Sequence, residues 1–236
     1  MIHFVDETGS TNADLLAGLS AGEALREGDW LAARRQVSGR GRQGRKWFDG
    51  AGNFMGSTIV RPAESDPPAH TLALLSGLAV YEALLPFCPD PSALTLKWPN
   101  DLLLRGAKLC GILLESQANT VVVGIGVNLR AAPDLPDRRT ISLSEVTATP
   151  ELEDFADRLA KSFAVELERW RSHGLELLIR RWQAAGHPKG TLLTVHDPSG
   201  DRVTGEFAGL DASGSLLLRD SDGKTHTVHA GDVNLD

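Results

Sequence analysis

Residues 39–47 combine glycines and cationic side chains at a spacing that can hold an anion. They read Gly-Arg-Gly-Arg-Gln-Gly-Arg-Lys-Trp, and glycine lets the backbone turn sharply and approach a ligand because it tolerates positive φ and has no side chain. Six Lys or Arg residues and no carboxylate lie between Asp29 and Asp49. The whole chain, by contrast, has 24 basic and 31 acidic residues and a net charge of −7. A local basic loop on an acidic protein favours one anionic ligand over an extended nucleic-acid surface.

Two other interpretations of this basic loop (residues 39–47) have to be weighed. The pattern Gly39-x-Gly41-x-x-Gly44 matches the dinucleotide-binding fingerprint, but that motif opens a helix on whose N-terminus the pyrophosphate rests. Here the residues after Gly44 continue to turn and do not predict a helix. A solvated basic loop without a ligand is the second alternative. The concentration of charge favours an anion-binding loop over both.

Composition limits the class of protein. A chain of 236 residues with 42% hydrophobic residues can bury one large core and add a small second domain. No run of 18 apolar residues predicts a membrane span, and the N-terminus lacks the pattern of a signal peptide. The cysteines, Cys88 and Cys110, show no metal-binding spacing with each other or with histidine. We therefore expect a cytoplasmic protein without a membrane segment or a protein-bound metal.

The chain divides near residue 187 into expected domains of residues 1–186 and 187–236. In the first, strand-like runs alternate with helical ones. The strands are expected at Ile2–Val5, Trp30–Ala33, Met55–Val60, Leu94–Trp98, Lys108–Ser116 and Val121–Leu129, the last apolar on both faces like a central strand. The helices are expected at Ala13–Leu19, at Leu72–Ala83 and from a cap at Thr149 with Pro150 in the first turn, interrupted at Gly174, to Ala185.

Residues 187–236 have the texture of a small antiparallel barrel. Three tetrapeptides with Asp first and Gly fourth, at 197–200, 211–214 and 220–223, favour type I turns. The short strands between them are expected at Leu192–His196, Val203–Leu210, Ser215–Arg219 and Thr225–His229. Because about 45 residues make a marginal core, we expect this unit to pack against the first domain.

Four further segments accompany the basic loop, and each alone has a structural explanation. Ser10-Thr11-Asn12 can cap a helix, and Lys97-Trp98-Pro99-Asn100-Asp101 can end a strand in a turn. The lysine of Lys108-Leu109-Cys110-Gly111 can be an exposed edge residue. The glycines of Gly124-Ile125-Gly126-Val127-Asn128 indicate a bulge or the close approach of a ligand.

Taken together with Gln36 and the basic loop, these segments resemble the biotin protein ligases. The resemblance covers residues 3 to about 130 in the family's order, and the C-terminal barrel also fits. It implies an α+β fold: a mixed-sheet catalytic domain like that of class II aminoacyl-tRNA synthetases with helices packed on it, followed by a small SH3-like β-barrel. The related lipoate ligases share the fold, but their loop has consecutive glycines after the arginines, which are lacking here.

The resemblance implies a reaction in two steps. Biotin attacks the α-phosphate of ATP to give biotinyl-5′-AMP, and a lysine of a carrier domain then displaces AMP. The implied small-molecule partners are biotin, ATP and Mg²⁺. The implied protein partner is the biotin carboxyl carrier domain of acetyl-CoA carboxylase or of another biotin-dependent carboxylase.

The resemblance also implies roles for individual residues. Those implied to bind biotin are Ser10, Thr11 and Asn12 at the ureido ring, Gln36, Arg40, Gly41 and Arg42 along the chain and carboxylate, and Gly111. Those implied on the nucleotide side are Arg42, Trp47, Asn100, Asp101 and Asn128. Lys108 is implied at the junction of the carboxylate and the α-phosphate, and it is the implied catalytic residue together with Arg40. Gly124 and Gly126 are expected to let the backbone line the pocket.

Three questions concern DNA binding, the oligomeric state and the rival functions. Many bacterial members of the family carry an N-terminal helix-turn-helix, whereas this chain starts at the first ligase strand, so we expect no specific DNA binding. The oligomeric state is open, and a homodimer is compatible with the sequence. The rival functions are a non-catalytic biotin or nucleotide sensor and a lipoate or octanoate transferase. The complete basic loop together with Lys108 favours the ligase over the sensor, because a pure biotin binder needs no phosphate-facing charge.

Overall fold

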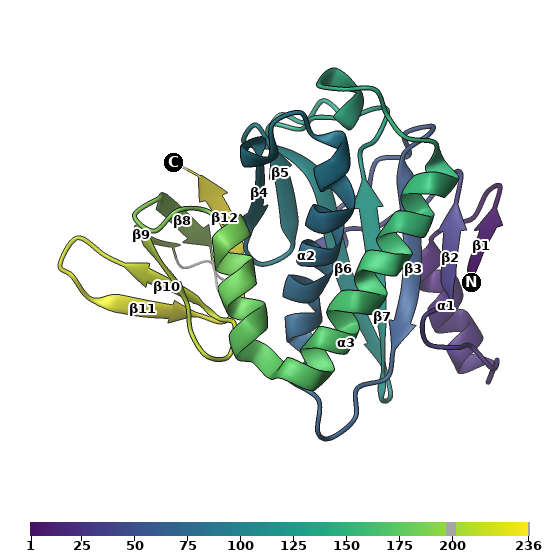
Figure 1. Cartoon of the computed structure of the whole chain (residues 1–236), viewed down its shortest axis with the longest axis horizontal. Helices are drawn as coiled ribbons and strands as arrows, with labels where there is room; N and C mark the ends of the chain where they lie inside the picture. Colours follow the sequence, from purple (N-terminus) through teal and green to yellow (C-terminus); the bar gives the residue numbers. More distant parts are fainter. Residues whose placement is uncertain (197–201, 236) are drawn as a thin grey trace.

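The computed structural model of the chain describes residues 1–196 and 202–235. Its larger part is a seven-stranded sheet in the order β1-β2-β3-β7-β6-β5-β4 (Figure 1). Neighbouring strands are antiparallel except for β1 and β2, which are parallel. The strands are β1 Ile2–Val5, β2 Trp30–Ala33, β3 Phe54–Val60, β4 Leu94–Lys97, β5 Asp101–Leu104, β6 Ala107–Gln117 and β7 Thr120–Val127.

Strand β7 lies in the middle of this sheet and has two different faces. Val123, Ile125 and Val127 belong to the hydrophobic core, whereas Gly124 and Gly126 alternate with them and point the other way. All eight residues of β7 are buried, as expected for a central strand. One face of β7 therefore carries the core, and on the opposite face Gly124 and Gly126 leave bare backbone over which other groups can lie.

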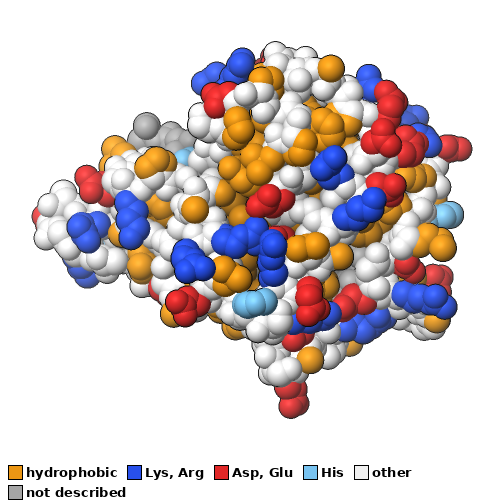
Figure 2. Space-filling model, viewed as in Figure 1, with side chains coloured by type: hydrophobic (Ala, Val, Ile, Leu, Met, Phe, Trp, Pro, Cys, Tyr) orange, Lys and Arg blue, Asp and Glu red, His pale blue; other side chains and the backbone are white. Residues whose placement is uncertain are grey.

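The helices are distributed over these two faces. Helices α2 (Leu72–Leu84) and α3 (Leu152–Ala185) pack against each other over the core face (Figure 1). Helix α1 (Thr11–Ser20) lies on the other face, where its side chains reach Gly124. Figure 2 shows basic and acidic side chains interspersed over the surface of the α2 and α3 side.

Helix α3 departs from the predicted start and agrees with the predicted interruption. Its N-cap is Glu151, whose carbonyl accepts the first helical hydrogen bond from Phe155 at 3.0 Å. The predicted cap at Thr149 and the place of Pro150 in the first turn are therefore wrong. Gly174 adopts φ 68° and ψ −162°, a backbone conformation that glycine tolerates, and it divides the helix as expected.

The C-terminal part forms a five-stranded antiparallel sheet in the order β11-β10-β9-β8-β12. Its strands are β8 Leu192–His196, β9 Arg202–Leu210, β10 Leu216–Arg219, β11 Thr225–Val228 and β12 Asp232–Leu235. Within the described residues its outer strands β11 and β12 do not pair with each other, so the sheet is antiparallel as predicted but is not a closed barrel. The turns at 211–214 and 220–223 have the expected i→i+3 hydrogen bonds of 3.0 Å, and the turn at 197–200 lies outside the described residues.

Two strands were not predicted. Residues 101–104 form β5, although the motif before them was interpreted as the end of a strand in a turn, and residues 232–235 form β12. Strand β4 correspondingly ends at Lys97, one residue earlier than predicted, because the chain reverses through residues 98–100 to pair β5 with β4. The division at residue 187 stays a prediction; α3 ends at Ala185 and β8 begins at Leu192.

Within the described residues, one helical stretch is long and apolar enough to cross a membrane by length and composition alone. It is Ala69–Phe87, which contains α2, and 67% of its most apolar window is buried inside the protein. Burial of this kind is typical of the core helix of a soluble protein, so the stretch is not a clear membrane span. The expected cytoplasmic location stays a prediction.

The packing of α3 on the sheet gives a stability prediction. Phe155 is fully buried, and its ring lies 5.5 Å from that of Phe54 on β3 in an edge-to-face arrangement. We expect Phe155→Ala to lower the free energy of unfolding by about 3–5 kcal/mol, because it leaves a cavity in the core. Urea denaturation measures this loss, and Val165→Ala at an exposed position of α3 is the control. Equal stability of the two variants would contradict the packing described.

Candidate active site

A cavity of about 1710 Å³ lies over the glycine face of the central strands. The basic loop, the start of α1, strands β6 and β7, residues 133–140 and the edge of the C-terminal sheet enclose it. The site residues expected from sequence all line this one cavity: Ser10, Thr11, Asn12, Gln36, Arg40, Gly41, Arg42, Trp47, Asn100, Asp101, Lys108, Gly111, Gly124, Gly126 and Asn128. Segments more than 100 residues apart in sequence therefore converge, and the roles of the individual residues stay proposals.

The start of α1 places polar groups at one end of the cavity. Ser10 occupies the N-cap position and is 6% exposed, yet its side chain makes no capping hydrogen bond. Thr11 donates its backbone N–H to Oε1 of Gln36 at 2.7 Å, and its hydroxyl lies 3.1 Å from the same oxygen. The simple explanation of this segment as a side-chain cap is therefore wrong for Ser10, whose hydroxyl is available to the cavity.

The same network continues across the sheet through a residue that the sequence did not single out. The hydroxyl of Ser57 on β3 lies 2.6 Å from that of Thr11 and donates to Oδ1 of Asn12 at 2.6 Å. The amide of Asn12 donates to Glu115 at 2.8 Å. The side chain of Asn12 is thus held in a fixed orientation at the cavity wall. Ser57 escaped prediction because a serine inside an apolar strand carries no motif of its own.

The glycines of the cavity floor make room for side chains of the site. A Cβ atom at Gly124 would lie 2.3 Å from Oδ1 of Asn12, and one at Gly126 would lie 2.3 Å from the Trp47 ring. A Cβ at Gly111 would meet the same ring at 2.8 Å. Real Cβ atoms do not approach other atoms so closely, so these positions require glycine. In this structure Asn12 and Trp47 occupy the space directly over the floor.

A buried carboxylate holds the two lysines of the cavity. Nζ of Lys108 donates to Oδ1 of Asp101 at 2.6 Å, and Nζ of Lys97 lies 3.8 Å from Oδ2. Burial alone raises the pKa of Asp101, but the charges of both lysines and the hydrogen bond outweigh burial and lower it below its usual value. Burial lowers the pKa of Lys97, although Asp101 opposes this shift. Nζ of Lys108 also lies 5.9 Å from the centre of the Trp47 ring, within range of a cation–π contact.

A β-bulge brings Lys108 into this position. Strand β5 pairs Leu102 with Cys110 but Leu103 with Lys108, so one extra residue, Leu109, lies on β6 between the two pairs. In a regular strand Lys108 and Gly111 would point to opposite faces because they are an odd number of residues apart. With the bulge, the Lys108 side chain lies against Gly111, 3.2 Å from the position of a Cβ there.

The basic loop has a defined backbone. Trp47 donates its N–H to the carbonyl of Gly39 at 2.9 Å, and Gly41 donates to Arg45 at 2.7 Å, so the two arms of the loop pair with each other. A short 3-10 turn at residues 42–44 closes it, with Gln43 at φ 57°. Arg40 is exposed and has no ion-pair or hydrogen-bond partner for its side chain among the residues described.

The C-terminal sheet holds the other two arginines of the loop. Arg45 donates from one guanidinium nitrogen to both carboxylate oxygens of Asp232, at 2.9 and 3.0 Å. Arg42 donates to Oδ1 of Asn100 at 2.9 Å and to the carbonyl of Gly231 at 3.1 Å. Asn100 in turn donates to the Ile112 carbonyl at 2.7 Å. Arg42 and Asn100 therefore already bind protein groups in this structure, and Asp232 is a cavity residue that the sequence analysis missed.

A second loop, residues 131–140, was also missed. The members that line the cavity are Pro133, Leu135, Asp137, Arg138, Arg139 and Thr140. Backbone hydrogen bonds anchor it to β6, with Lys108 donating to Arg139 at 2.9 Å and Ile141 donating to Lys108 at 3.1 Å. The length of this connection could have identified it, because 24 residues separate β7 from α3 and long irregular connections are commonly functional.

Two polar atoms of the cavity residues are buried without a hydrogen-bond partner in the described part of the chain. They are Nε1 of Trp47 and Oδ1 of Asn128. The amide nitrogen of Asn128 donates to the Ile141 carbonyl at 3.3 Å, which fixes the side chain with its oxygen left over. An unpaired buried donor and acceptor are costly, so both atoms are free to bind a polar ligand or water.

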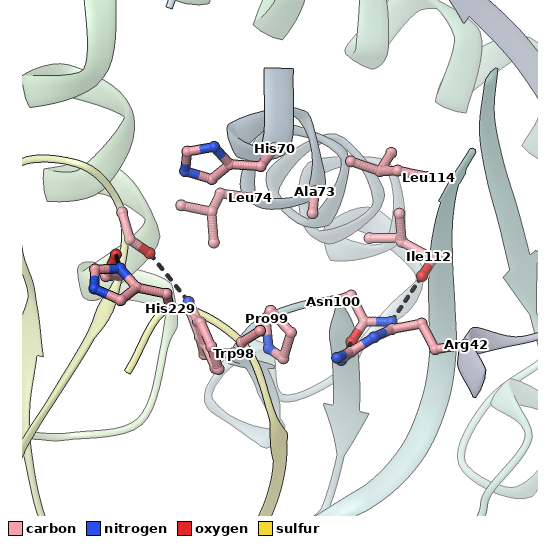
Figure 3. Close-up of a pocket in the computed structure, with 13 residues that line it drawn as sticks. Arg42, His70, Ala73, Leu74, Trp98, Pro99, Asn100, Ile112, Leu114 and His229 are labelled. Atoms are coloured by element: carbon pink, nitrogen blue, oxygen red, sulfur yellow. Dashed lines mark hydrogen bonds between the residues drawn. The ribbon is translucent and has the colours of Figure 1, made fainter. Parts of the chain in front are cut away.

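A smaller pocket of about 220 Å³ adjoins the cavity between the two sheets (Figure 3). Five residues line both spaces: Arg42, Trp98, Pro99, Asn100 and Ile112. The smaller pocket is otherwise walled by apolar side chains of α2 and β6 and by His70 and His229. Trp98 donates from its indole nitrogen to the Gly214 carbonyl at 3.0 Å and closes one side. This pocket marks the contact through which the C-terminal sheet rests on the larger domain.

The carboxylates of the cavity are neutralised by neighbouring cations. Asp49 lies beside Arg35, Asp101 beside Lys108, Asp137 beside Arg138 and Asp232 beside Arg45. No group of three His, Cys, Asp or Glu side chains that could hold a metal lies within residues 1–196 and 202–235. The arrangement therefore provides net positive charge and little affinity for a free cation.

The contact of Asp232 with the loop gives a second prediction. We expect Asp232→Asn to loosen residues 39–47, because a partly exposed ion pair of this kind is worth about 1 kcal/mol. Hydrogen exchange of these amides is then about fivefold faster than in the unchanged protein. Asp222→Asn, an exposed carboxylate of the same sheet, is the control. Unchanged exchange in the Asp232 variant would show that the loop is held by other contacts.

Comparison with known proteins gives the chain its family. The model of the biotin/lipoate A/B protein ligase family matches residues 8–130, and that of the biotin protein ligase C-terminal domain matches residues 194–236. The biotin–[acetyl-CoA-carboxylase] ligase of Paracoccus denitrificans is 36% identical over 92% of this chain and 93% of its own length. The enzyme of the same name from Mycobacterium tuberculosis is 39% identical over 97% and 86%.

The fold agrees with a solved structure of the same kind. The biotin protein ligase of Aquifex aeolicus in complex with biotin and ATP superposes with a TM-score of 0.88 at 25% identity, covering 100% of this chain and 99% of that one. This confirms the fold predicted from sequence, a mixed-sheet ligase domain followed by a small C-terminal β-sheet unit. By sequence and by structure, the chain belongs to the biotin/lipoate A/B protein ligase family.

Proposed function

We propose that this chain is an ATP-dependent biotin protein ligase, which activates biotin as biotinyl-5′-AMP and transfers the biotinyl group to a lysine of a carrier protein. The observation that carries the proposal is the cavity in which Lys108 and the basic loop face the same space. The names of the Paracoccus and Mycobacterium relatives and the ligands of the Aquifex structure support it.

In the first step, a carboxylate oxygen of biotin attacks the α-phosphorus of ATP, and the bond to the bridging oxygen breaks to release pyrophosphate. Both reactants are anions, so their approach requires preorganised positive charge. Lys108 is suited to this task at the junction, because a hydrogen bond of 2.6 Å to Asp101 fixes its ammonium group in a partly buried position. Arg40 is suited to hold the biotin carboxylate, because its guanidinium is not committed to a protein group in the described structure.

The two ends of the cavity suit the two ligands. The biotin ureido group has one carbonyl acceptor and two N–H donors, and the hydroxyl of Ser10 and the network through Thr11 and Asn12 offer matching groups. At the other end, Oδ1 of Asn128 is a buried acceptor that an exocyclic amine of a nucleobase can satisfy. The remaining proposed roles are those of Gln36, Gly41, Arg42 and Gly111 for biotin and Arg42, Trp47, Asn100 and Asp101 for the nucleotide.

In the second step, the neutral amine of a lysine attacks the carbonyl carbon of the mixed anhydride, the bond to the phosphate oxygen breaks, and AMP leaves. An anhydride of this kind hydrolyses readily, so water must be excluded from the intermediate until the carrier protein binds. The Trp47 ring over Gly111 and Gly126 and the paired arms of the basic loop can cover the intermediate.

Mg²⁺ is proposed to enter with the nucleotide. The carboxylates of the cavity are each beside a cation, so the protein offers no cluster of its own, and Mg²⁺ commonly binds through substrate phosphates and water. When bound, the ion neutralises charge on the phosphates and favours the departure of pyrophosphate.

The proposed protein partner is the biotin carboxyl carrier domain of acetyl-CoA carboxylase or of a related carboxylase, as the names of the relatives suggest. The expectations of no specific DNA binding and of a homodimer as one allowed state stay predictions.

The substrate assignment is tested by pyrophosphate release. With ATP and Mg²⁺ present, we expect biotin to stimulate release strongly and lipoate or octanoate to stimulate it little, because the polar groups at the start of α1 match a ureido ring and not a dithiolane or an alkyl chain. Mass spectrometry of the acid-quenched reaction identifies the adenylate formed. Release with lipoate at the rate seen with biotin would favour the lipoate transferase instead, and tight binding of biotin without release would favour a sensor.

The role of Lys108 is tested by Lys108→Ala. We expect the rate of biotinyl-AMP formation to fall roughly 10²–10³-fold, as for the loss of one preorganised charge at a transition state. Because the change leaves Asp101 buried without its closest partner, the double variant Lys108→Ala/Asp101→Asn is compared for thermal stability. Lys161→Ala on α3 is the control. A folded Lys108→Ala protein that forms biotinyl-AMP at nearly the original rate would remove Lys108 from the reaction.

A further inference from the structure

Large hydrophobic side chains are exposed around the opening of the cavity. Six such residues are exposed in the described part of the chain, and three of them line the cavity: Val37 at 54%, Phe48 at 37% and Leu135 at 39%. The other three are the N-terminal residue and two positions on α3 and β8. A residue that is both exposed and part of the cavity wall lies where the cavity opens to solvent.

These three residues come from the two loops that border the cavity. Val37 and Phe48 flank the basic loop on its two sides, just outside the pairing of Gly39 with Trp47. Leu135 lies on the second loop, whose end is anchored to β6 through Lys108. The apolar side chains thus flank the opening from both loops, next to the proposed junction of the reaction.

The same opening carries cations that the protein does not neutralise. Lys46 and Arg139 line the cavity, are exposed, and have no ion-pair partner for their side chains within the described residues. Every carboxylate of the cavity lies beside another cation and is not available to them. Uncompensated positive charge therefore gathers at the opening of a protein whose net charge is −7.

We propose that the rim formed by Val37, Phe48, Leu135, Lys46 and Arg139 is the docking surface for the carrier protein, a compact domain that presents its target lysine beside an apolar residue and acidic side chains. The proposal rests on the proposed function, because only the second step brings a protein to this cavity. Biotin and ATP bind inside the cavity, and neither requires apolar side chains in solvent around its opening.

The chemistry of the second step determines where the carrier must lie. A lysine side chain is a single flexible stem, so the carrier backbone has to approach the opening for its amine to reach an anhydride held near Lys108. Acidic groups on the carrier complement Lys46 and Arg139, and an apolar residue beside the lysine covers Val37 and Phe48. Complementary charge mainly speeds the encounter, whereas the covered apolar residues prolong it.

The test separates docking from chemistry with rim variants and two acceptors. The variants are Val37→Asp, Phe48→Ser, Leu135→Ser and Arg139→Glu. Each is assayed for biotin-dependent pyrophosphate release, for transfer from biotinyl-AMP to a purified acetyl-CoA carboxylase carrier domain, and for transfer to methylamine, which needs no docking. We expect the KM for the carrier to rise about tenfold or more, as for the loss of an interface anchor, while pyrophosphate release and transfer to methylamine stay unchanged.

Matched controls lie on α3. Val165→Asp replaces a residue of 48% exposure, and Lys161→Glu reverses an exposed charge far from the cavity in sequence; we expect neither to change the KM for the carrier. Raising the salt concentration should weaken carrier binding to the unchanged protein and should weaken it less for Arg139→Glu.

Three results would overturn the docking surface. The first is a KM for the carrier that stays at the original value in all four rim variants. The second is a fall in pyrophosphate release and in transfer to methylamine alike, which would assign the rim to the small ligands. The third is a rim variant that changes the sedimentation behaviour of the protein alone, which would assign the rim to a second copy of the chain. Absence of pyrophosphate release in the unchanged protein would instead overturn the proposed function, so the two failures are distinguishable.

Discussion

The alternation of side chains along β7 is the constraint on which the fold and the site both depend. Val123, Ile125 and Val127 pack into the core under α2 and α3, so the strand cannot shift by one residue without exposing them. That fixed register aims Gly124 and Gly126 at the opposite face, where Asn12 and Trp47 lie directly on the backbone. The hydrophobic core thereby determines where the site residues can approach the sheet. A single added methyl group on the site face would displace them without touching the core.

One carboxylate, that of Asp101, holds the positively charged lysines beside these glycines. Asp101 holds Lys108 in the cavity, and the attraction outweighs the cost of burying the acid, as its lowered pKa shows. The hydrogen bond thus fixes the position of the Lys108 ammonium group. The remaining carboxylates of the cavity each lie beside an arginine, so none of them is left unpaired to repel an anionic ligand. A site with net positive charge is the physical requirement for bringing a carboxylate and a triphosphate together.

Much of this could be predicted from the sequence because the relevant signals are local. Apolar alternation indicated most strands, Gly174 marked the division of α3, and the basic loop and Lys108 stood out by residue type and spacing. The resemblance to biotin protein ligases added the order of the motifs and so the fold. The residues of the cavity wall that belong to these motifs could therefore be named from the sequence, but their positions could not.

The parts that escaped prediction depend on tertiary contacts. The bulge at Leu109 moves Lys108 to the face of Gly111, and only the pairing of β5 with β6 reveals it. Strand β12 is only four residues long, so the polar and apolar alternation of Asp232–Leu235 is too short to predict a strand, and its pairing with β8 identifies it. Its first residue, Asp232, is consequently invisible to sequence reasoning as a partner of the basic loop. The same holds for the second loop, whose composition resembles that of any solvated connection.

Strand β12 and the residue before it connect the C-terminal sheet to the cavity. The C-terminal sheet reaches the cavity through Asp232 and the Gly231 carbonyl, which hold Arg45 and Arg42, while Trp98 binds the Gly214 carbonyl from the larger domain. The basic loop is therefore fixed at its base by its own backbone pairing and at its tip by another domain. A ligand that drew Arg42 toward its own negative charge would have to replace the contacts with Asn100 and Gly231 in the same movement. With Arg42 in its proposed role, binding at the cavity and the docking of the C-terminal sheet would be energetically linked, because both would use the same guanidinium group.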